Sequence, residues 1–253
     1  MSESKTDSAT SFGLSAAGYA HARRGYPDEI FDTILNAAPG RASALDLGAG
    51  SGQATGPLAA RFDAVIAVEP DARLTAEGNF PGNVTVVNEA AEAADFSDNS
   101  FNAIISATAF HWMDQAGICE AAARWLKPGG IFFPFAYGTF DYPEAMKPME
   151  AAEQEKWTPY KDRRLLENYD YPPILERSGA FASVRPYEIV MRKDYTPRDA
   201  ACLMATTSFG SAYARDHEGG VDTYIERLTA EIETLMETVA IGFPIIGAIG
   251  TRA

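Results

Sequence analysis

Apolar and polar residues follow two alternating patterns along this chain. Short runs of consecutive apolar residues are typical of parallel strands that are covered on both faces. The runs that predict strands are residues 43–47, 64–68, 84–87, 101–107, 131–136, 184–191 and 243–250. Between residues 43 and 136 they alternate with stretches of helical spacing, and this alternation predicts a parallel sheet with right-handed crossovers.

The predicted helices begin and end at recognisable signals. Pro27, followed by two acidic residues, predicts a helix start. Asp114 is expected to cap a helix that runs through Leu126. Gly179 is the expected C-terminal residue of another helix. The full set of predicted helices is 27–39, 53–61, 72–77, 114–126, 172–178, 197–213 and 221–238.

Three alternating glycines, Gly48, Gly50 and Gly52, follow the first predicted strand. Glycine permits positive φ, and without a Cβ it lets a ligand approach the backbone closely. The next helix adds unpaired N–H groups and a partial positive charge at its N-terminus. A dinucleotide fingerprint would need glycine or alanine at position 53, which is Gln53. The loop is therefore a candidate binding site for another ligand, or an ordinary strand-to-helix turn.

Glu69 is predicted at the tip of the second strand, about 20 residues after the glycines, and Pro70 follows it. An acidic residue at this place can accept hydrogen bonds from ribose hydroxyls. The alternative is a solvated carboxylate at a strand end. In both cases we expect the side chain to lie outside the core, so that its replacement barely changes folding.

Composition narrows the function classes. The chain has 253 residues, 46% of them hydrophobic, and a net charge of −14. The negative charge disfavours nucleic acid and anionic membranes as partners. The two cysteines have no disulfide-framework or metal-site spacing, so we expect no metal. The N-terminal segment lacks the apolar core of a signal peptide, and we expect a cytoplasmic protein.

Several motifs resemble one family. The pattern D-x-G-x-G-x-G, which begins at Asp46, resembles motif I of the class I S-adenosylmethionine-dependent methyltransferases. Other segments are similar to a subgroup that includes the trans-aconitate and quinone-biosynthesis methyltransferases. These segments are Tyr19 with Arg23 and Tyr26-Pro27, Ala91-Glu92, His111-Trp112 and the Leu-Lys-Pro-Gly-Gly run before the fifth strand.

The resemblance implies S-adenosylmethionine as cofactor. Tyr19 and Arg23 would close over its methionine end, where Arg23 suits a carboxylate. Ala91 and Glu92 would lie near the adenine, with backbone contacts. Together with the glycine loop and the strand tip, the predicted cofactor-binding residues are Tyr19, Arg23, Gly48, Ala49, Gly50, Gly52, Glu69, Pro70, Leu74, Ala91, Glu92, Ser106 and Thr108.

His111 is the predicted catalytic residue. It follows the fourth strand at the sheet edge where open α/β sheets bind ligands. Its ordinary pKa near 6.5 suits proton removal at neutral pH. It could act as a base, position the acceptor, or only pack beside Trp112. The predicted substrate-binding residues are Tyr26, His111, Trp112 and Tyr137.

The resemblance also completes the predicted architecture. We expect an α/β fold, a Rossmann-like seven-stranded and mostly parallel sheet flanked by helices, with a small helical cap inserted around strand 6. We expect one methyltransferase domain over residues 1–253. Residues 1–12 would be a disordered tail, and 138–171 and 194–238 would be the cap and substrate insertions.

The predicted function is methyl transfer from S-adenosylmethionine to a small-molecule acceptor by in-line displacement. The alternatives are a nicotinamide-dependent oxidoreductase and a noncatalytic S-adenosylmethionine-binding module. Departures from the subgroup pattern at Arg24, Ala90 and Asn102 keep the second alternative open. The sequence leaves open the acceptor, the atom that is methylated and the oligomeric state.

Overall fold

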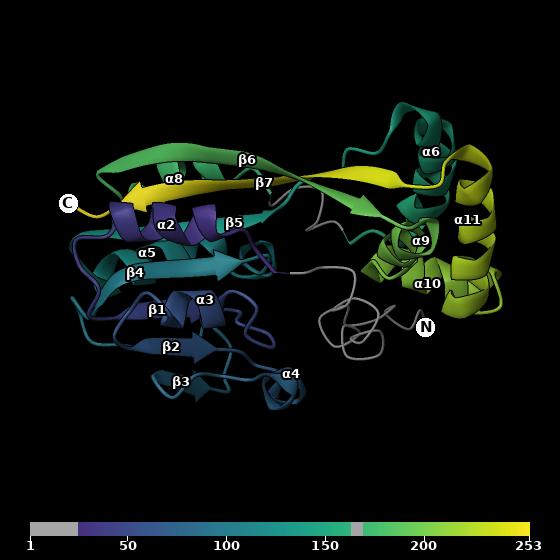
Figure 1. Ribbon diagram of the computed structural model, residues 1–253. Helices are drawn as coiled ribbons and strands as arrows, with labels where there is room; N and C mark the ends of the chain where they lie inside the picture. The colour runs from purple at the N-terminus through teal and green to yellow at the C-terminus, as the bar shows by residue number, and fades with distance from the viewer. Residues whose placement is uncertain (1–24, 163–168) are drawn as a thin grey trace, which may run out of the picture. The chain divides into compact units, whose positions relative to one another are not determined.

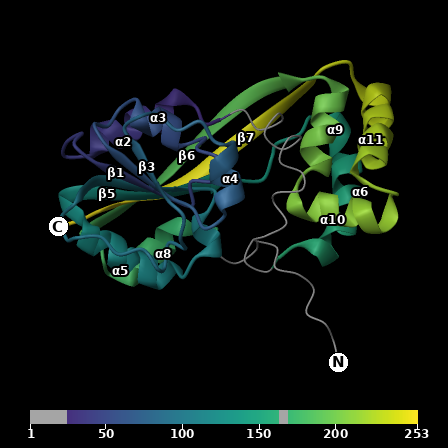
Figure 2. The same ribbon diagram turned by 90° about the horizontal axis from the view of Figure 1, so that it is seen from below.

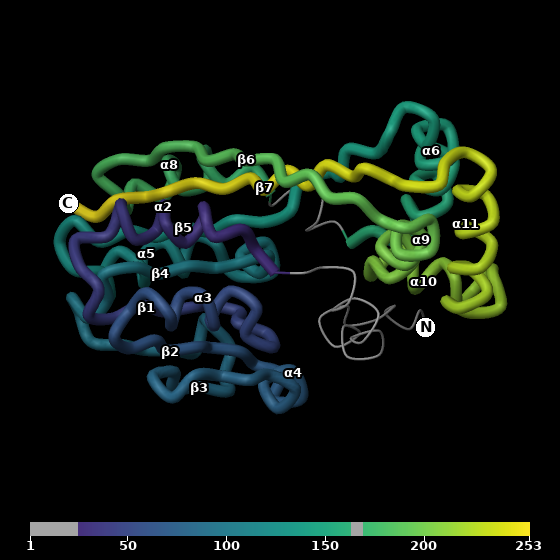
Figure 3. Tube along the Cα trace, viewed as in Figure 1, coloured from purple at the N-terminus to yellow at the C-terminus, as the bar shows by residue number. Residues whose placement is uncertain are grey.

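The computed structural model describes residues 25–162 and 169–253, so the predicted tail, residues 1–12, lies outside the described residues. Figure 3 traces the course of the chain. The described residues divide into two compact units. The sheet unit comprises 25–138, 169–189 and 245–253, and the helical unit comprises 139–162 and 190–244. The expectation of one domain with inserted cap segments stays a prediction.

A seven-stranded sheet confirms the predicted fold class (Figure 1). Its strand order is β3-β2-β1-β4-β5-β7-β6. Strands β1 to β5 pair in parallel, and β7 runs antiparallel to β5. The strands are β1 (Ala44–Leu47), β2 (Val65–Val68), β3 (Val84–Val87), β4 (Phe101–Ala107), β5 (Leu126–Tyr137), β6 (Ser183–Tyr195) and β7 (Val239–Thr251).

Helices cover both faces of this sheet (Figure 2). On one face lie α2 (Asp28–Ala37) and α3 (Thr55–Ala59), and on the other lie α5 (Gln115–Trp125) and α8 (Tyr171–Ser178). Helix α4 (Ala72–Glu77) follows β2, and the 3-10 turn η2 (Phe110–Trp112) follows β4. In the described part of the chain, no helix has the length and apolar content needed to cross a lipid bilayer.

The order of the strands places the candidate site. From β1 the chain runs outward to β2 and β3, and then returns to β4 on the other side of β1. The connections therefore leave β1 and β4 in opposite directions, and open α/β sheets bind ligands at such a point, beyond the carboxyl ends of the strands. The segments that follow these two strands are the glycine loop and the turn η2.

Several element bounds differ from the sequence predictions. Strand β5 begins at Leu126, because Leu126 pairs with Phe101 and a register irregularity before Ala103 accommodates the intervening Pro-Gly-Gly segment. The single helix predicted over 197–213 is wrong. The chain there forms α9 (Pro197–Ala205) and α10 (Ser208–His217), because the Thr207 hydroxyl accepts a hydrogen bond from the Gly210 N–H and so caps a new helix.

The helical unit contains α6 (Lys147–Trp157), α9, α10 and α11 (Val221–Leu235), with the 3-10 turns η3 (Glu144–Met146) and η4 (Thr158–Tyr160). No helix was predicted over α6. Its mean hydropathy is low and its apolar residues are few, so the periodic signal that identifies an amphipathic helix is weak there. Residues of β6 and β7 belong to both units.

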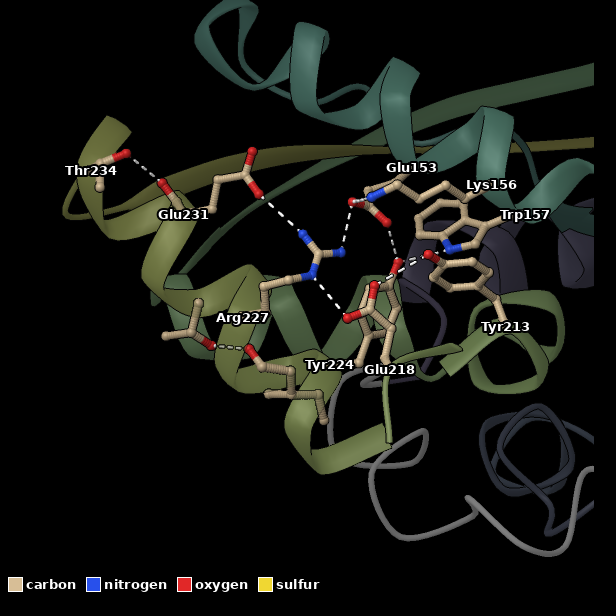
Figure 4. Close-up of polar contacts among 11 residues, drawn as sticks. Glu153, Lys156, Trp157, Tyr213, Glu218, Tyr224, Arg227, Glu231 and Thr234 are labelled. Carbon is tan, nitrogen blue, oxygen red and sulfur yellow. Dashed lines mark hydrogen bonds and ion pairs between the residues drawn. The ribbon is translucent and has the colours of Figure 1, made fainter. Parts of the chain in front are cut away.

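A buried ion cluster joins α6 to α11 inside the helical unit (Figure 4). The Glu153 side chain is 2% exposed and accepts hydrogen bonds from Lys156 and Arg227, both at 2.8 Å, and from the Tyr224 hydroxyl. The Tyr224 oxygen in turn accepts from the Trp157 indole N–H at 2.8 Å. Burial raises the pKa of Glu153, but the three hydrogen bonds together hold it below its ordinary value.

We expect Glu153→Ala to lower the unfolding free energy of the full chain by about 2 kcal/mol, because the buried Tyr224 hydroxyl loses its acceptor and Lys156 and Arg227 lose a buried partner. The effect stays modest because Arg227 and Lys156 are 34% and 37% exposed and remain hydrated. Urea denaturation followed by circular dichroism measures it. The matched control is Glu231→Ala, which removes an exposed partner of Arg227 and should cost about 0.5 kcal/mol or less. Equal losses in the two variants would contradict this role of Glu153.

Candidate cofactor site

The three glycines of the loop differ in what surrounds them. All three have positive φ: 75° at Gly48, 57° at Gly50 and 89° at Gly52. A Cβ at Gly48 would lie 2.4 Å from the Ala109 Cβ, and one at Gly52 would lie 2.8 Å from a Phe80 ring carbon. A Cβ at Gly50 would meet no atom within 4 Å. Two of the glycines are thus required by packing, whereas the third borders open space.

Backbone hydrogen bonds hold the loop against β2. The N–H groups of Gly48 and Ala49 both donate to the Val68 carbonyl, at 2.8 and 3.0 Å. The Glu69 carboxylate then accepts from the Gly50 N–H at 2.9 Å and from the Asp71 N–H at 3.0 Å. The acidic strand tip therefore fixes the glycine loop directly.

The expectation that Glu69 lies outside the core was wrong. Its side chain is only 7% exposed, because the glycine loop and the turn that follows β2 close around the carboxylate. Each carboxylate oxygen can accept a second hydrogen bond. Ribose binding by Glu69 stays a prediction, now for a residue that also has a structural role.

We expect Glu69→Gln to weaken S-adenosylmethionine binding by about 10-fold and to lower the unfolding free energy by about 1 kcal/mol, because an amide cannot accept from two N–H groups through both of its ends. Titration calorimetry and urea denaturation measure the two effects. Glu77→Gln, on the exposed face of α4, is the control and should change neither quantity. A Glu69→Gln protein with wild-type affinity would remove Glu69 from the site.

Asp46 is the first residue of the glycine motif, and the sequence analysis did not place it among the site residues. Its side chain is fully buried at the end of β1. Burial raises the pKa of Asp46 to about 7; a 2.7 Å hydrogen bond from the Thr55 hydroxyl lowers it, and the nearby Glu69 charge raises it. Among the described residues, nothing donates a hydrogen bond to the other carboxyl oxygen, Oδ1. A buried acid with an unused oxygen thus lies next to the loop.

The end of β4 brings further predicted residues to this edge. Thr108 has a φ of 55°, an outlier for a β-branched residue, and its hydroxyl is 2.8 Å from the Tyr26 hydroxyl. The Tyr26 ring stacks on Tyr137, with ring centroids 5.3 Å apart. Ser106 is different: its side chain is fully buried and its hydroxyl donates to the Leu47 carbonyl at 2.9 Å, which joins β4 to β1. The side chain of Ser106 therefore has no free surface for a ligand.

The remaining residues predicted to bind the cofactor differ in how exposed they are. Pro70 is exposed and Leu74 is half-buried. Ala91 is buried in the core, whereas Glu92 is exposed and its carboxylate accepts from the Asp114 N–H at 3.0 Å, at the start of α5. The segment 91–95 and α5 line a hollow of about 340 Å³. Tyr19 and Arg23 lie outside the described residues.

His111 is enclosed by aromatic side chains, two of which the sequence analysis did not assign to the site. It is 1% exposed, and its ring stacks on Tyr169 with centroids 4.3 Å apart and lies 4.8 Å from the Trp112 ring. The Tyr169 hydroxyl is 3.3 Å from Nε2, and the Tyr171 hydroxyl is 3.4 Å from Nδ1. No sequence signal connects these tyrosines, about 60 positions downstream, to His111.

A comparison with known proteins finds a family match over the segment that contains the site. Residues 45–133 match the family described as Methyltransferase domain. This segment begins in β1 and ends in β5, so it contains the glycine loop, Glu69 and His111. The cofactor of this family is S-adenosylmethionine, as the resemblance implied.

A relative and two solved structures extend the comparison. An uncharacterized methyltransferase of Mycobacterium bovis is 38% identical over 132 residues, which are 51% of this chain and 53% of that protein. A candidate type II methyltransferase from Anaeromyxobacter dehalogenans has a TM-score of 0.74 at 23% identity, over 90% of this chain and 97% of that one. A phosphoethanolamine N-methyltransferase of Haemonchus contortus, solved with S-adenosyl-L-methionine, has a TM-score of 0.51 at 18% identity, over 94% and 56% of the two chains.

These matches cover only part of the curated relatives. The chain spans about half the length of the curated relatives it matches. The structural neighbours show the methyltransferase fold, and the family match concerns residues 45–133. They do not select the trans-aconitate and quinone-biosynthesis subgroup.

Proposed function

We propose that this chain transfers a methyl group from S-adenosylmethionine to a small-molecule acceptor. The observation that carries the proposal is Gly50, which combines a left-handed backbone with open space where a Cβ would point, directly after β1. At this place in the sheet, the open side of a glycine lets a ligand come close to the loop backbone. The family match over residues 45–133 supports S-adenosylmethionine as that ligand.

The residues at this edge suit the cofactor chemically. Its methionine part carries positive charge on the sulfonium and the ammonium, and Asp46 and Glu69 are two acids beside the loop. The Oδ1 of Asp46 is buried and has no partner among the described residues, so it would reach a cationic group through a bridging water molecule. Glu69 keeps lone pairs for ribose hydroxyls. We therefore propose that Gly48–Gly52, Glu69, Pro70, Leu74, Ala91 and Glu92 hold the cofactor, together with Thr108 and with Tyr19 and Arg23.

The chain's own residues would bind and orient the reactants. When bound, the cofactor supplies an electrophilic methyl group, so the protein mainly has to align an acceptor for in-line attack. We propose that Tyr26, Tyr137 and Trp112 shape the acceptor pocket with His111. Their aromatic surfaces exclude water, and their hydroxyl and N–H groups can orient a polar acceptor.

Methyl transfer is tested by incubating the full chain with isotopically labelled S-adenosylmethionine and a metabolite pool. We expect label to appear in a small molecule and S-adenosylhomocysteine to accumulate. Binding of the cofactor without turnover would favour a noncatalytic binding module instead. Reduction of a nicotinamide without methyl incorporation would favour an oxidoreductase.

A further inference from the structure

The two ring nitrogens of His111 face two different tyrosines. Tyr171, at the start of α8, approaches Nδ1, and Tyr169 approaches Nε2. A neutral imidazole carries one N–H donor and one acceptor nitrogen. One ring nitrogen of His111 must therefore donate and the other accept. The surroundings of the two tyrosine hydroxyls indicate which nitrogen carries the proton.

Burial distinguishes the two hydroxyls. Tyr171 is fully buried, and in the described part of the chain its hydroxyl has a single hydrogen-bond partner, the Nδ1 of His111. Burial also raises the pKa of Tyr171 well above its ordinary value, so the hydroxyl keeps its proton. Tyr169 is only half-buried, so an unmet hydrogen bond at its hydroxyl costs less than one at the fully buried Tyr171.

The cost of leaving the buried Tyr171 O–H without an acceptor favours one of the two tautomers of His111. If Nδ1 carried the proton, it would donate to the Tyr171 oxygen and leave the buried O–H of Tyr171 without an acceptor. A buried donor without a partner carries the full cost of its lost hydration. If Tyr171 donates to Nδ1, that cost disappears, and Nε2–H points toward the Tyr169 hydroxyl.

We propose that Tyr171 is a positioning residue that holds neutral His111 in the tautomer with its proton on Nε2. His111 then presents a hydrogen-bond donor, and not a base, toward the side occupied by Tyr169. Both contacts are long, at 3.3 Å for Tyr169 and 3.4 Å for Tyr171, so the full burial of Tyr171, and not the bond length, distinguishes the two partners.

This inference deepens the proposed function. If the chain is a methyltransferase, the Nε2–H of His111 would orient an acceptor through a lone pair beside the attacked methyl group. An acceptor that already has a free nucleophilic lone pair would fit, whereas one that must first lose a proton to Nε2 would not. The tautomer itself does not depend on the reaction.

The test is nuclear magnetic resonance of the full chain with ¹⁵N-labelled histidine, at pH 8.5, where an ordinary histidine is neutral. The chain has three histidines, and His111→Gln assigns the His111 signals by their loss. We expect Nε2 at the position of a protonated ring nitrogen and Nδ1 at that of an unprotonated one. The reverse pattern in the wild-type protein would overturn the proposal.

Tyr171→Phe removes only the hydroxyl and should shift the Nδ1 signal toward the protonated position, as the two tautomers mix. Tyr169→Phe is the matched control and should leave the wild-type tautomer in place. Unchanged ¹⁵N shifts in Tyr171→Phe would contradict the positioning role. Failure of the proposed function is separate: a chain that binds no S-adenosylmethionine in calorimetry could still show the expected tautomer.

Discussion

Gly50→Ala is expected to weaken S-adenosylmethionine binding by about 100-fold while the chain still folds. The methyl group would enter space that is empty of protein atoms within 4 Å, so packing does not oppose it. It would instead occupy the place proposed for the cofactor. The positive φ of 57° adds about 1–2 kcal/mol of backbone strain, which lowers stability but not affinity as such. Titration calorimetry measures the affinity and urea denaturation the stability.

Gly179 offers a matched control for the backbone strain. It ends α8 with a φ of 64°, and a Cβ there would also meet nothing within 4 Å. Gly179→Ala should therefore cost similar stability and leave cofactor affinity unchanged. If both variants bound S-adenosylmethionine like the wild type, the open side of Gly50 would not be part of the site.

Asp46→Asn is expected to remove a large pH dependence of stability. The pKa of Asp46 is raised from 3.8 to about 7 in the folded chain, mainly by burial. Between these pH values the folded chain keeps a proton that the unfolded chain has released, so raising the pH favours unfolding. This shift in the pKa of Asp46 corresponds to about 4 kcal/mol of unfolding free energy. That contribution is lost as the pH rises from about 4 to 7. Urea denaturation of both proteins across this range gives the difference directly.

Thr55→Val is expected to change the pH dependence of stability in the opposite direction from Asp46→Asn. Its hydroxyl donates to Asp46 at 2.7 Å and lowers the pKa of that carboxyl, so its removal should extend the loss of stability to higher pH. Valine keeps nearly the same volume at this fully buried position. An Asp46→Asn protein with the pH dependence of the wild type would contradict the raised pKa.

Local signals explain why much of the fold could be predicted from the sequence. The glycine spacing, the apolar strands and the Asp114 cap each depend on neighbouring residues, and the structure contains all three. The break between α9 and α10 was also encoded locally, by Thr207, but the helical pattern continues across it and hides the cap. Element type was therefore easier to predict than element bounds.

The contacts of the site could not be predicted in the same way, because they join distant parts of the chain. The Glu69 carboxylate accepts a hydrogen bond from the Gly50 backbone, and the sequence around Glu69 does not predict that contact. His111 meets Tyr169 and Tyr171 only because α8 packs beside α5 on one face of the sheet. The type of each residue suggested the chemistry, whereas its partners came from the three-dimensional arrangement.

The most direct test of the central claim is titration calorimetry of the full chain with S-adenosylmethionine, and separately with NADH. The glycine spacing, the open side of Gly50 and the family match over residues 45–133 all lead us to expect saturable binding of S-adenosylmethionine at one site and none of NADH. Binding of NADH without binding of S-adenosylmethionine would contradict the account.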